Sequence, residues 1–250
     1  MKRAEFQFFA ELNDFLPKAQ QGIRFPYAFQ DHPTVKHSIE SLGIPHTEIF
    51  AIRANDHLVD FSYQIQHGDF IRVYPPSQAG EINPETVVFE RPERCPRFVL
   101  DTHLGRLAAY LRMLGFDSWY RNDYEDEELA QLAGDNGRVL LTRDRRLLMR
   151  SRVRFGICIR SLTPEEQVVE VLERYRLFDK ITPFKRCLRC NHPLSPIAKE
   201  TVLGRLEPLT RLYFDEFHYC PACEHIYWKG SHYDRMKDFI QRVSQETPGD

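Results

Sequence analysis

The chain has 250 residues, of which 42% are hydrophobic and 28% are charged, and its formal net charge is −2. This is the composition of an ordinary globular protein, long enough for one large domain or two to three small ones. The small net charge excludes a globally basic nucleic-acid binder. No run of 18 or more apolar residues suggests a membrane span, and the polar start of the chain is not a signal peptide. We therefore expect a cytoplasmic protein without membrane contact, in which cysteines serve as metal ligands or core thiols rather than disulfides.

Changes in composition divide the chain into four segments. Residues 1–76 end at a Pro-Pro pair, and residues 77–94 form a linker rich in turn formers and charge. The short apolar run at 87–89 in this linker predicts an extra edge strand. Residues 95–180 alternate between strand and helix patterns, and residues 181–250 are organised around two pairs of cysteines.

The first segment has the pattern of a β-grasp, or ubiquitin-like, fold. Strand patterns occur around Phe6 and Phe8, at 49–52 and at 70–74, and residues 32–43 have helical spacing that ends at a glycine. The phrases "FFAELNDFL" and "QIQHGDFIRVYPP" resemble the sulfur-carrier branch of that fold. Carriers of this branch end in an exposed Gly-Gly, and none follows Pro76 here. We therefore expect this domain to pack against the chain or to recruit a protein partner.

The third segment predicts an α/β fold with a parallel sheet and helices on both faces. Strands are expected at 97–101, 116–120, 138–142 and 153–159, and helices at 104–115, 126–137, 145–151 and 163–175. The last of these helices begins with a capping box formed by Thr163 and Glu166. Strands separated by helices of this length require crossover connections, which make the sheet parallel.

Acidic residues follow three of the expected strands. Asp101 closes the first strand, Asp123 and Asp126 follow the second, and Asp144 follows the third. The carboxyl ends of parallel strands meet at one edge, where open α/β sheets bind ligands. Carboxylates gathered there would hold Mg²⁺ or Mn²⁺, which activates water for phosphodiester hydrolysis. Each acid also has a structural interpretation, as a helix cap or as an acid in the first turn of a helix.

Arginines surround the predicted acidic site. Arg143 and Arg145 flank Asp144, and Arg106 lies in the helix that follows Asp101. Guanidinium groups bind phosphate oxygens in pairs, so these residues are candidates for contacts with a nucleic-acid backbone. The alternative is that they are solvated arginines on helix surfaces.

Two longer phrases, "VLDTHLGRLAAYLRMLGFD" and "ELAQLAGDNGRVLLTRDRRLL", together with the cysteine region, resemble the Mut-seven C-terminal family of PIN-like ribonucleases over residues 96–240. The resemblance implies a PIN-like fold, RNA as substrate, Asp101 and Asp144 as metal ligands, and Asp126 as the third acid. Many related domains have a second acid two residues after the "T-R-D" aspartate. Arg146 stands there in this chain, so we expect one catalytic metal ion rather than two.

The last segment carries two Cys-x-x-Cys pairs. Cys187 and Cys190 form the first pair and Cys220 and Cys223 the second. Two such turns supply the four thiolates of a tetrahedral, structural Zn²⁺ site, which has no open position for catalysis. Disulfides or an iron–sulfur cluster are less favoured alternatives. We therefore predict a zinc ribbon, followed by a helix with one apolar face. Cys158, within an apolar strand, is expected to be a core thiol.

Three functions remain open on the sequence alone. The leading hypothesis is a metal-dependent ribonuclease with catalytic Mg²⁺ or Mn²⁺ and a structural zinc ion. The second is a non-catalytic RNA-binding or adaptor protein that retains the fold, which Arg146 favours. The third, a partner in sulfur transfer, depends only on the N-terminal fold and is weakened by the missing Gly-Gly.

Overall fold

The structure is a computed structural model, and it describes residues 1–81 and 92–245. The edge strand expected at 87–89 lies outside these ranges. The chain divides into two compact units. The first contains Met1–Glu93 and Glu125–Cys158, and the second contains Arg94–Tyr124 and Ile159–Asp250.

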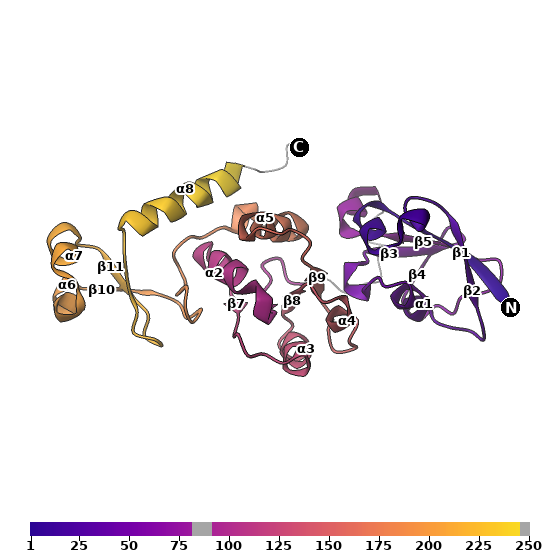
Figure 1. The fold of residues 1–250 in the computed structure, drawn as a ribbon, viewed down its shortest axis with the longest axis horizontal. Helices are drawn as coiled ribbons and strands as arrows, with labels where there is room; N and C mark the ends of the chain where they lie inside the picture. The colour runs from indigo at the N-terminus through magenta and orange to yellow at the C-terminus, as the bar shows by residue number, and fades with distance from the viewer. Residues whose placement is uncertain (82–91, 246–250) are drawn as a thin grey trace. The chain divides into compact units, whose positions relative to one another are not determined.

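The N-terminal part of the first unit is a mixed five-stranded sheet with one helix, as the sequence predicts (Figure 1). The strand order is β2-β1-β5-β3-β4, with β1 and β5 parallel and the other neighbours antiparallel. The elements are β1 (Lys2–Phe8), β2 (Phe25–Phe29), α1 (Val35–Ser41), β3 (Ala51–Ala54), β4 (His57–Val59) and β5 (Phe70–Tyr74).

Alternating apolar residues direct one face of β1 into the core. Ala4, Phe6 and Phe8 are buried, whereas the residues between them are partly exposed. Helix α1 begins because the Thr34 side chain accepts a hydrogen bond from the His37 N–H, at 3.2 Å. Strand β3 begins two residues later than the sequence pattern predicts. A 3₁₀ turn, η3 (His46–Glu48), occupies the chain just before it and keeps Ile49 out of the sheet.

The first unit also contains part of the α/β region. Its elements are α3 (Asp126–Asp135), β8 (Val139–Thr142), α4 (Arg145–Leu148) and β9 (Gly156–Cys158). Strands β8 and β9 are parallel, and every residue of β8 is buried. Gly156 allows this close packing, since a Cβ atom there would lie 2.5 Å from Leu148 Cδ2 and 3.0 Å from the Leu140 carbonyl oxygen.

The second unit contains the other parallel pair of strands. Its α/β elements are β6 (Phe98–Leu100), α2 (Gly105–Met113), β7 (Ser118–Trp119) and α5 (Pro164–Tyr175). Helices α2 and α5 pack against each other, and α5 begins with the predicted capping box. Each unit thus contains one parallel pair of strands, β6 with β7 and β8 with β9, which agrees with the predicted α/β class. All four strands begin and end within the predicted ranges, but they are shorter.

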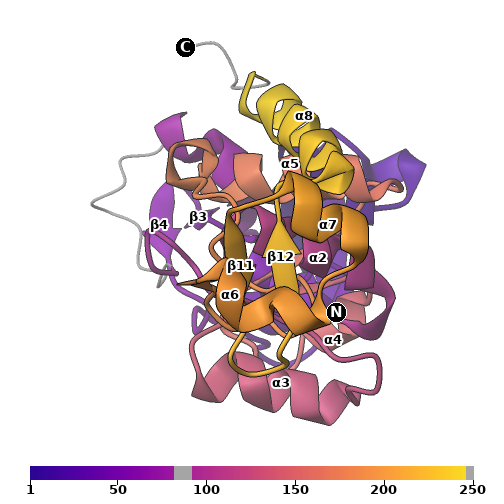
Figure 2. The ribbon, with the colours of Figure 1, turned by 90° about the vertical axis from the view of Figure 1, so that its left-hand side faces the viewer.

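The C-terminal part of the second unit is a small antiparallel sheet with helices beside it (Figure 2). Its elements are β10 (Ser195–Ile197), α6 (Lys199–Val202), α7 (Pro208–Tyr213), β11 (Phe217–Tyr219), β12 (Ile226–Trp228) and α8 (Ser231–Gln245). The apolar residues Val202, Leu206, Phe217 and Ile226 form its core. The last helix packs as expected, since the Phe239 ring stacks on that of Tyr110 with centroids 4.7 Å apart. None of the helices in the described ranges is both long and apolar enough to cross a membrane.

Candidate functional site

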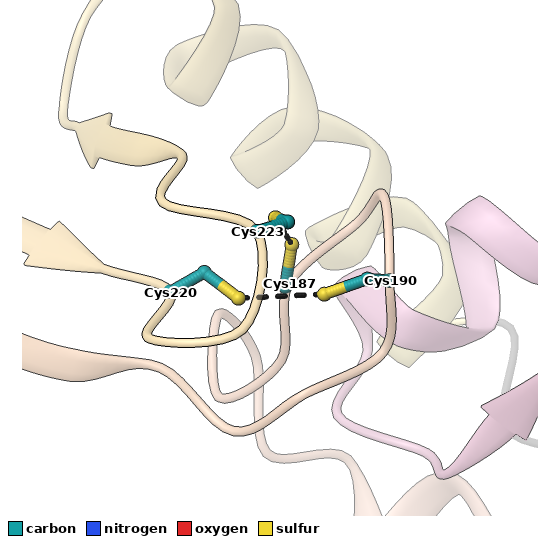
Figure 3. Close-up of side chains that lie close together, drawn as sticks. All are labelled: Cys187, Cys190, Cys220 and Cys223. Carbon is teal, nitrogen blue, oxygen red and sulfur yellow. Dashed lines mark hydrogen bonds between the residues drawn. The ribbon is translucent and has the colours of Figure 1, made fainter.

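The four cysteines predicted as zinc ligands come together at one point, with their sulfur atoms directed toward one another (Figure 3). All four Sγ atoms lie within 4.8 Å of one another. Cys187 Sγ is 3.5 Å from Cys223 Sγ, and Cys190 Sγ is 3.4 Å from Cys220 Sγ. These separations exceed the roughly 2.05 Å of a disulfide. They are close to the roughly 3.8 Å expected between sulfurs on the corners of a zinc tetrahedron with 2.3 Å bonds.

The two cysteine loops have the same backbone design. In each, the N–H of the first cysteine donates to the carbonyl five residues later, at 2.9 Å: Cys187 to His192 and Cys220 to His225. In each, the fourth residue after the first cysteine has a positive φ angle, 70° at Asn191 and 58° at Glu224. This turn brings the second cysteine back beside the first. The Cys-x-x-Cys spacing therefore produces two equivalent halves of one metal site.

The protonation of the thiols fits a site that requires a cation. Burial raises the pKa of the Cys187 thiol. Hydrogen bonds to its sulfur, led by that from the Tyr227 hydroxyl, outweigh burial and lower this pKa to about 6. Burial raises the pKa of Cys190 to about 12. One thiolate thus forms readily, whereas four thiolates this close repel one another unless a divalent ion neutralises them. In the described part of the chain, no other group of three or more Cys, His, Asp or Glu residues comes this close together.

The first cysteine loop is fastened to the turn between α2 and β7. The Asn191 side chain accepts a hydrogen bond from the Ser118 N–H and donates one to Asp117 Oδ1, both at 2.9 Å. The buried Arg112 guanidinium donates to the carbonyls of Leu188 and Arg189, at 3.0 and 2.9 Å. These contacts join the zinc ribbon to the α/β part of the second unit. Sequence reasoning missed Asn191 and Arg112, because their partners lie more than 70 positions away in the chain.

Asp144, the predicted metal ligand after β8, lies at the N-terminus of α4. Its Oδ1 atom accepts the Arg146 N–H at 2.7 Å, and its own N–H donates to the Thr142 hydroxyl at 3.0 Å. The residue is exposed to solvent. Within the described residues, Oδ2 has no hydrogen-bond or ion-pair partner. The carboxylate is therefore held by one oxygen and presents the other to solvent.

The other two predicted acids occupy different local settings. Asp126 is the exposed first residue of α3 and lies 3.9 Å from Arg150, which also pairs with Glu127. Asp101 directly follows β6, is half-buried, and accepts a hydrogen bond from the Thr102 hydroxyl at 3.1 Å. Asp126 and Asp144 belong to the first unit, and Asp101 belongs to the second.

The three predicted substrate-binding arginines also differ from one another. The Arg145 guanidinium donates to the Phe15 carbonyl at 3.2 Å and lies 4.8 Å from the centre of the Phe15 ring. Arg143 is exposed beside Asp144. Arg106, on α2, is close enough to Glu165 for its positive charge to contribute to lowering the pKa of that carboxyl, which depends mainly on the Tyr110 hydroxyl.

Two family descriptions match the chain. The one for the Mut7-C RNAse domain matches residues 96–240, and the one for the Mut7-C ubiquitin domain matches residues 1–81. The first match covers more than half of the chain, and the order of the two is that expected from the motifs. The predicted resemblance is therefore confirmed. A search of curated proteins and a search of solved structures each found no match.

Proposed function

Since the chain belongs to the Mut7-C RNAse domain family, we propose that it is a metal-dependent ribonuclease with a structural zinc ribbon. The family match suggests nuclease activity, and the observation that carries the metal-dependent part is the setting of Asp144. A carboxylate at the end of a buried parallel strand, with one oxygen held by the backbone and one directed to solvent, is ready to bind a cation.

We propose that Asp101, Asp126 and Asp144 hold one Mg²⁺ or Mn²⁺ ion. The donors fit such an ion because all three are hard carboxylate oxygens, and Asp101 and Asp144 follow buried parallel strands. Asp126 and Asp144 are exposed, whereas Asp101 is partly buried. When bound, a divalent ion lowers the pKa of a water molecule and stabilises the charge of an in-line phosphodiester displacement. The Asp144 backbone contacts keep its carboxylate oriented for this role.

Exposed arginine side chains would position the RNA backbone. Arg143 is exposed beside Asp144, and guanidinium groups bind phosphate oxygens bidentately. Arg106 is the corresponding candidate on α2. The zinc ion, held by the four cysteines, would fix the ribbon and leave no position for substrate.

Arg146 favours a second function, that of a non-catalytic RNA-binding or adaptor protein that retains the fold. In many related domains an acid stands at this position and contributes to the metal site. A cation there instead reduces the negative charge available to a second ion, and a chain that binds RNA without cutting it would tolerate this change. The proposal therefore limits the catalytic site to one ion.

Cleavage of labelled RNA tests the proposal. We expect wild-type protein to cut single-stranded or structured RNA when Mn²⁺ or Mg²⁺ is added and not when both are omitted. Asp144→Asn should lower the cleavage rate by about 100-fold or more, because it removes a ligand charge at the reaction centre. Asp135→Asn is the matched control, because Asp135 is an exposed aspartate at the C-terminal end of α3 that is not one of the three proposed ligands.

The outcomes distinguish the two functions. Equal cleavage by wild type and Asp144→Asn would place the activity elsewhere or in a contaminant. RNA binding without cleavage by any preparation would replace the ribonuclease with the adaptor.

A further inference from the structure

A cleft of about 460 Å³ lies between the ubiquitin-like domain and α4, within the first unit. One wall comes from the C-terminal end of α1, at Glu40 and Gly43. The opposite side comes from the Arg143–Arg146 segment and Met149. The volume falls within the range of about 300–1,000 Å³ typical of sites for small ligands. The ubiquitin-like domain and Asp144 therefore line the same cleft.

Two arginines of this cleft differ in whether their guanidinium groups already have partners within the protein. Arg145 is held in place, since its guanidinium donates to the Phe15 carbonyl and lies over the Phe15 ring. The Arg146 side chain is exposed, and within the described residues its guanidinium has no hydrogen-bond or ion-pair partner. Its backbone N–H donates to Asp144 Oδ1, and its carbonyl accepts the Met149 N–H. Arg146 therefore has all five guanidinium N–H donors available for a ligand.

The charge of the cleft favours an anion. Three arginines face two carboxylates, Asp144 and Glu40. Glu40 Oε1 lies 2.8 Å from His46 Nδ1, while His46 Nε2 lies 2.8 Å from the Val153 carbonyl oxygen. One oxygen of Glu40 is therefore already in contact with the His46 ring. The three guanidinium charges exceed the two carboxylate charges, so the cleft carries excess positive charge beside Asp144.

We propose that this cleft binds a phosphodiester of an RNA strand beside Asp144, with Arg146 as its main ligand and the ubiquitin-like domain as one wall. Bidentate guanidinium contacts are the strong hydrogen bonds by which proteins hold phosphate. This assignment gives Arg146 a role, since an acid at the same position would repel the strand. It rests on the proposed function only in taking RNA as the ligand. It adds that the ubiquitin-like domain forms part of the binding site.

RNA binding measured without cleavage tests the assignment. The probe is a fluorescein-labelled, single-stranded RNA of about 12 nucleotides, followed by anisotropy in zinc-containing buffer without added Mg²⁺ or Mn²⁺. Potassium chloride is varied between about 50 and 200 mM, because each phosphate contact contributes to the dependence of Kd on salt. We compare wild type with Arg146→Gln, Arg146→Lys and the control Arg152→Gln. Arg152 is an exposed arginine of the same unit, paired with Asp135 and outside the cleft.

We expect Arg146→Gln to raise Kd about tenfold, and to reduce the slope of log Kd against log salt by about 0.7, the value of one single-strand phosphate contact. Arg146→Lys should retain most of the slope with weaker binding, because lysine keeps the charge but not the bidentate geometry. Arg152→Gln should bind as wild type. Thermal unfolding of each variant shows whether it is folded.

Three results would decide the matter. Unchanged Kd and slope in folded Arg146→Gln overturn the assignment. Inorganic phosphate is the second probe, and if Arg146→Gln loses only phosphate binding while RNA binding persists, the cleft takes free phosphate and the RNA assignment fails. If wild type cuts no RNA but Arg146→Gln still weakens RNA binding, the subsite stands and the ribonuclease proposal fails.

Discussion

At the scale of single residues, Asp144 has a structural role that can be separated from its proposed catalytic one. Its side chain caps α4 by accepting the Arg146 N–H. Asparagine caps helices about as well as aspartate, whereas alanine does not, and the loss of a cap costs about 1 kcal/mol. We therefore expect Asp144→Asn to leave the free energy of unfolding nearly unchanged and Asp144→Ala to lower it by about 1 kcal/mol. Urea unfolding measures both values. If Asp144→Asn loses as much free energy of unfolding as Asp144→Ala, a lower cleavage rate in Asp144→Asn could not be assigned to the loss of a metal ligand.

The residues that could be predicted are those whose chemistry is local. The four cysteines followed from spacing alone, since each pair closes its own turn. The position of Asp144 at the end of a buried strand was also predictable, because the apolar run at 139–141 comes directly before it. Arg145 was predicted only as a phosphate ligand, and its contact with Phe15 joins positions 130 residues apart. No local pattern in the sequence indicates such a partner.

At the scale of elements, the two cysteine loops have the same backbone but different attachments. The Asn191 side chain is bound to Ser118 and Asp117, whereas within the described residues the exposed Glu224 side chain has no comparable contact. Asn191→Gly and Glu224→Gly keep the positive φ angle without strain, so they compare the side chains alone. We expect Asn191→Gly to lower the free energy of unfolding by about 1–3 kcal/mol, because the buried Ser118 N–H loses its acceptor. Glu224→Gly should have little effect, and equal losses in both zinc-loaded variants would contradict a role for the Asn191 side chain.

Elements with clear periodicity or caps were predictable, and short ones were not. The capping box places the start of α5 where the structure has it. Helices α6 and α7 have only 4 and 6 residues, too few to show a helical pattern in sequence. Helix α6 is stabilised by packing, since its last residue, Val202, contributes to the same core as Phe217 and Ile226. That contribution appears only when the ribbon is folded.

At the scale of the whole molecule, the ubiquitin-like domain is fastened to the β9 region by buried polar contacts. The Glu48 carboxylate, which is only 1% exposed, accepts the Cys158 N–H at 2.6 Å. His46, on the same 3₁₀ turn, contacts the Val153 carbonyl oxygen at 2.8 Å. The composition of 77–94 predicts a linker between separate domains. Contacts between residues more than 100 positions apart, which no linker composition reveals, place Met1–Glu93 and Glu125–Cys158 in one compact unit.

This attachment gives a final test of the wall proposed for the RNA cleft. Glu48→Ala leaves the buried Cys158 N–H without its acceptor, at a cost of about 1–3 kcal/mol, whereas Glu48→Gln keeps an acceptor oxygen. We expect Glu48→Ala to speed hydrogen exchange of the Cys158 amide and to raise the Kd for the 12-nucleotide RNA a few-fold. The salt dependence should not change, because Glu48 contacts no phosphate and every arginine of the cleft is retained. Glu48→Gln should resemble wild type in both measurements. If exchange accelerates in Glu48→Ala while RNA binding stays at the wild-type value, the ubiquitin-like domain is attached at this point without forming a wall that the RNA requires.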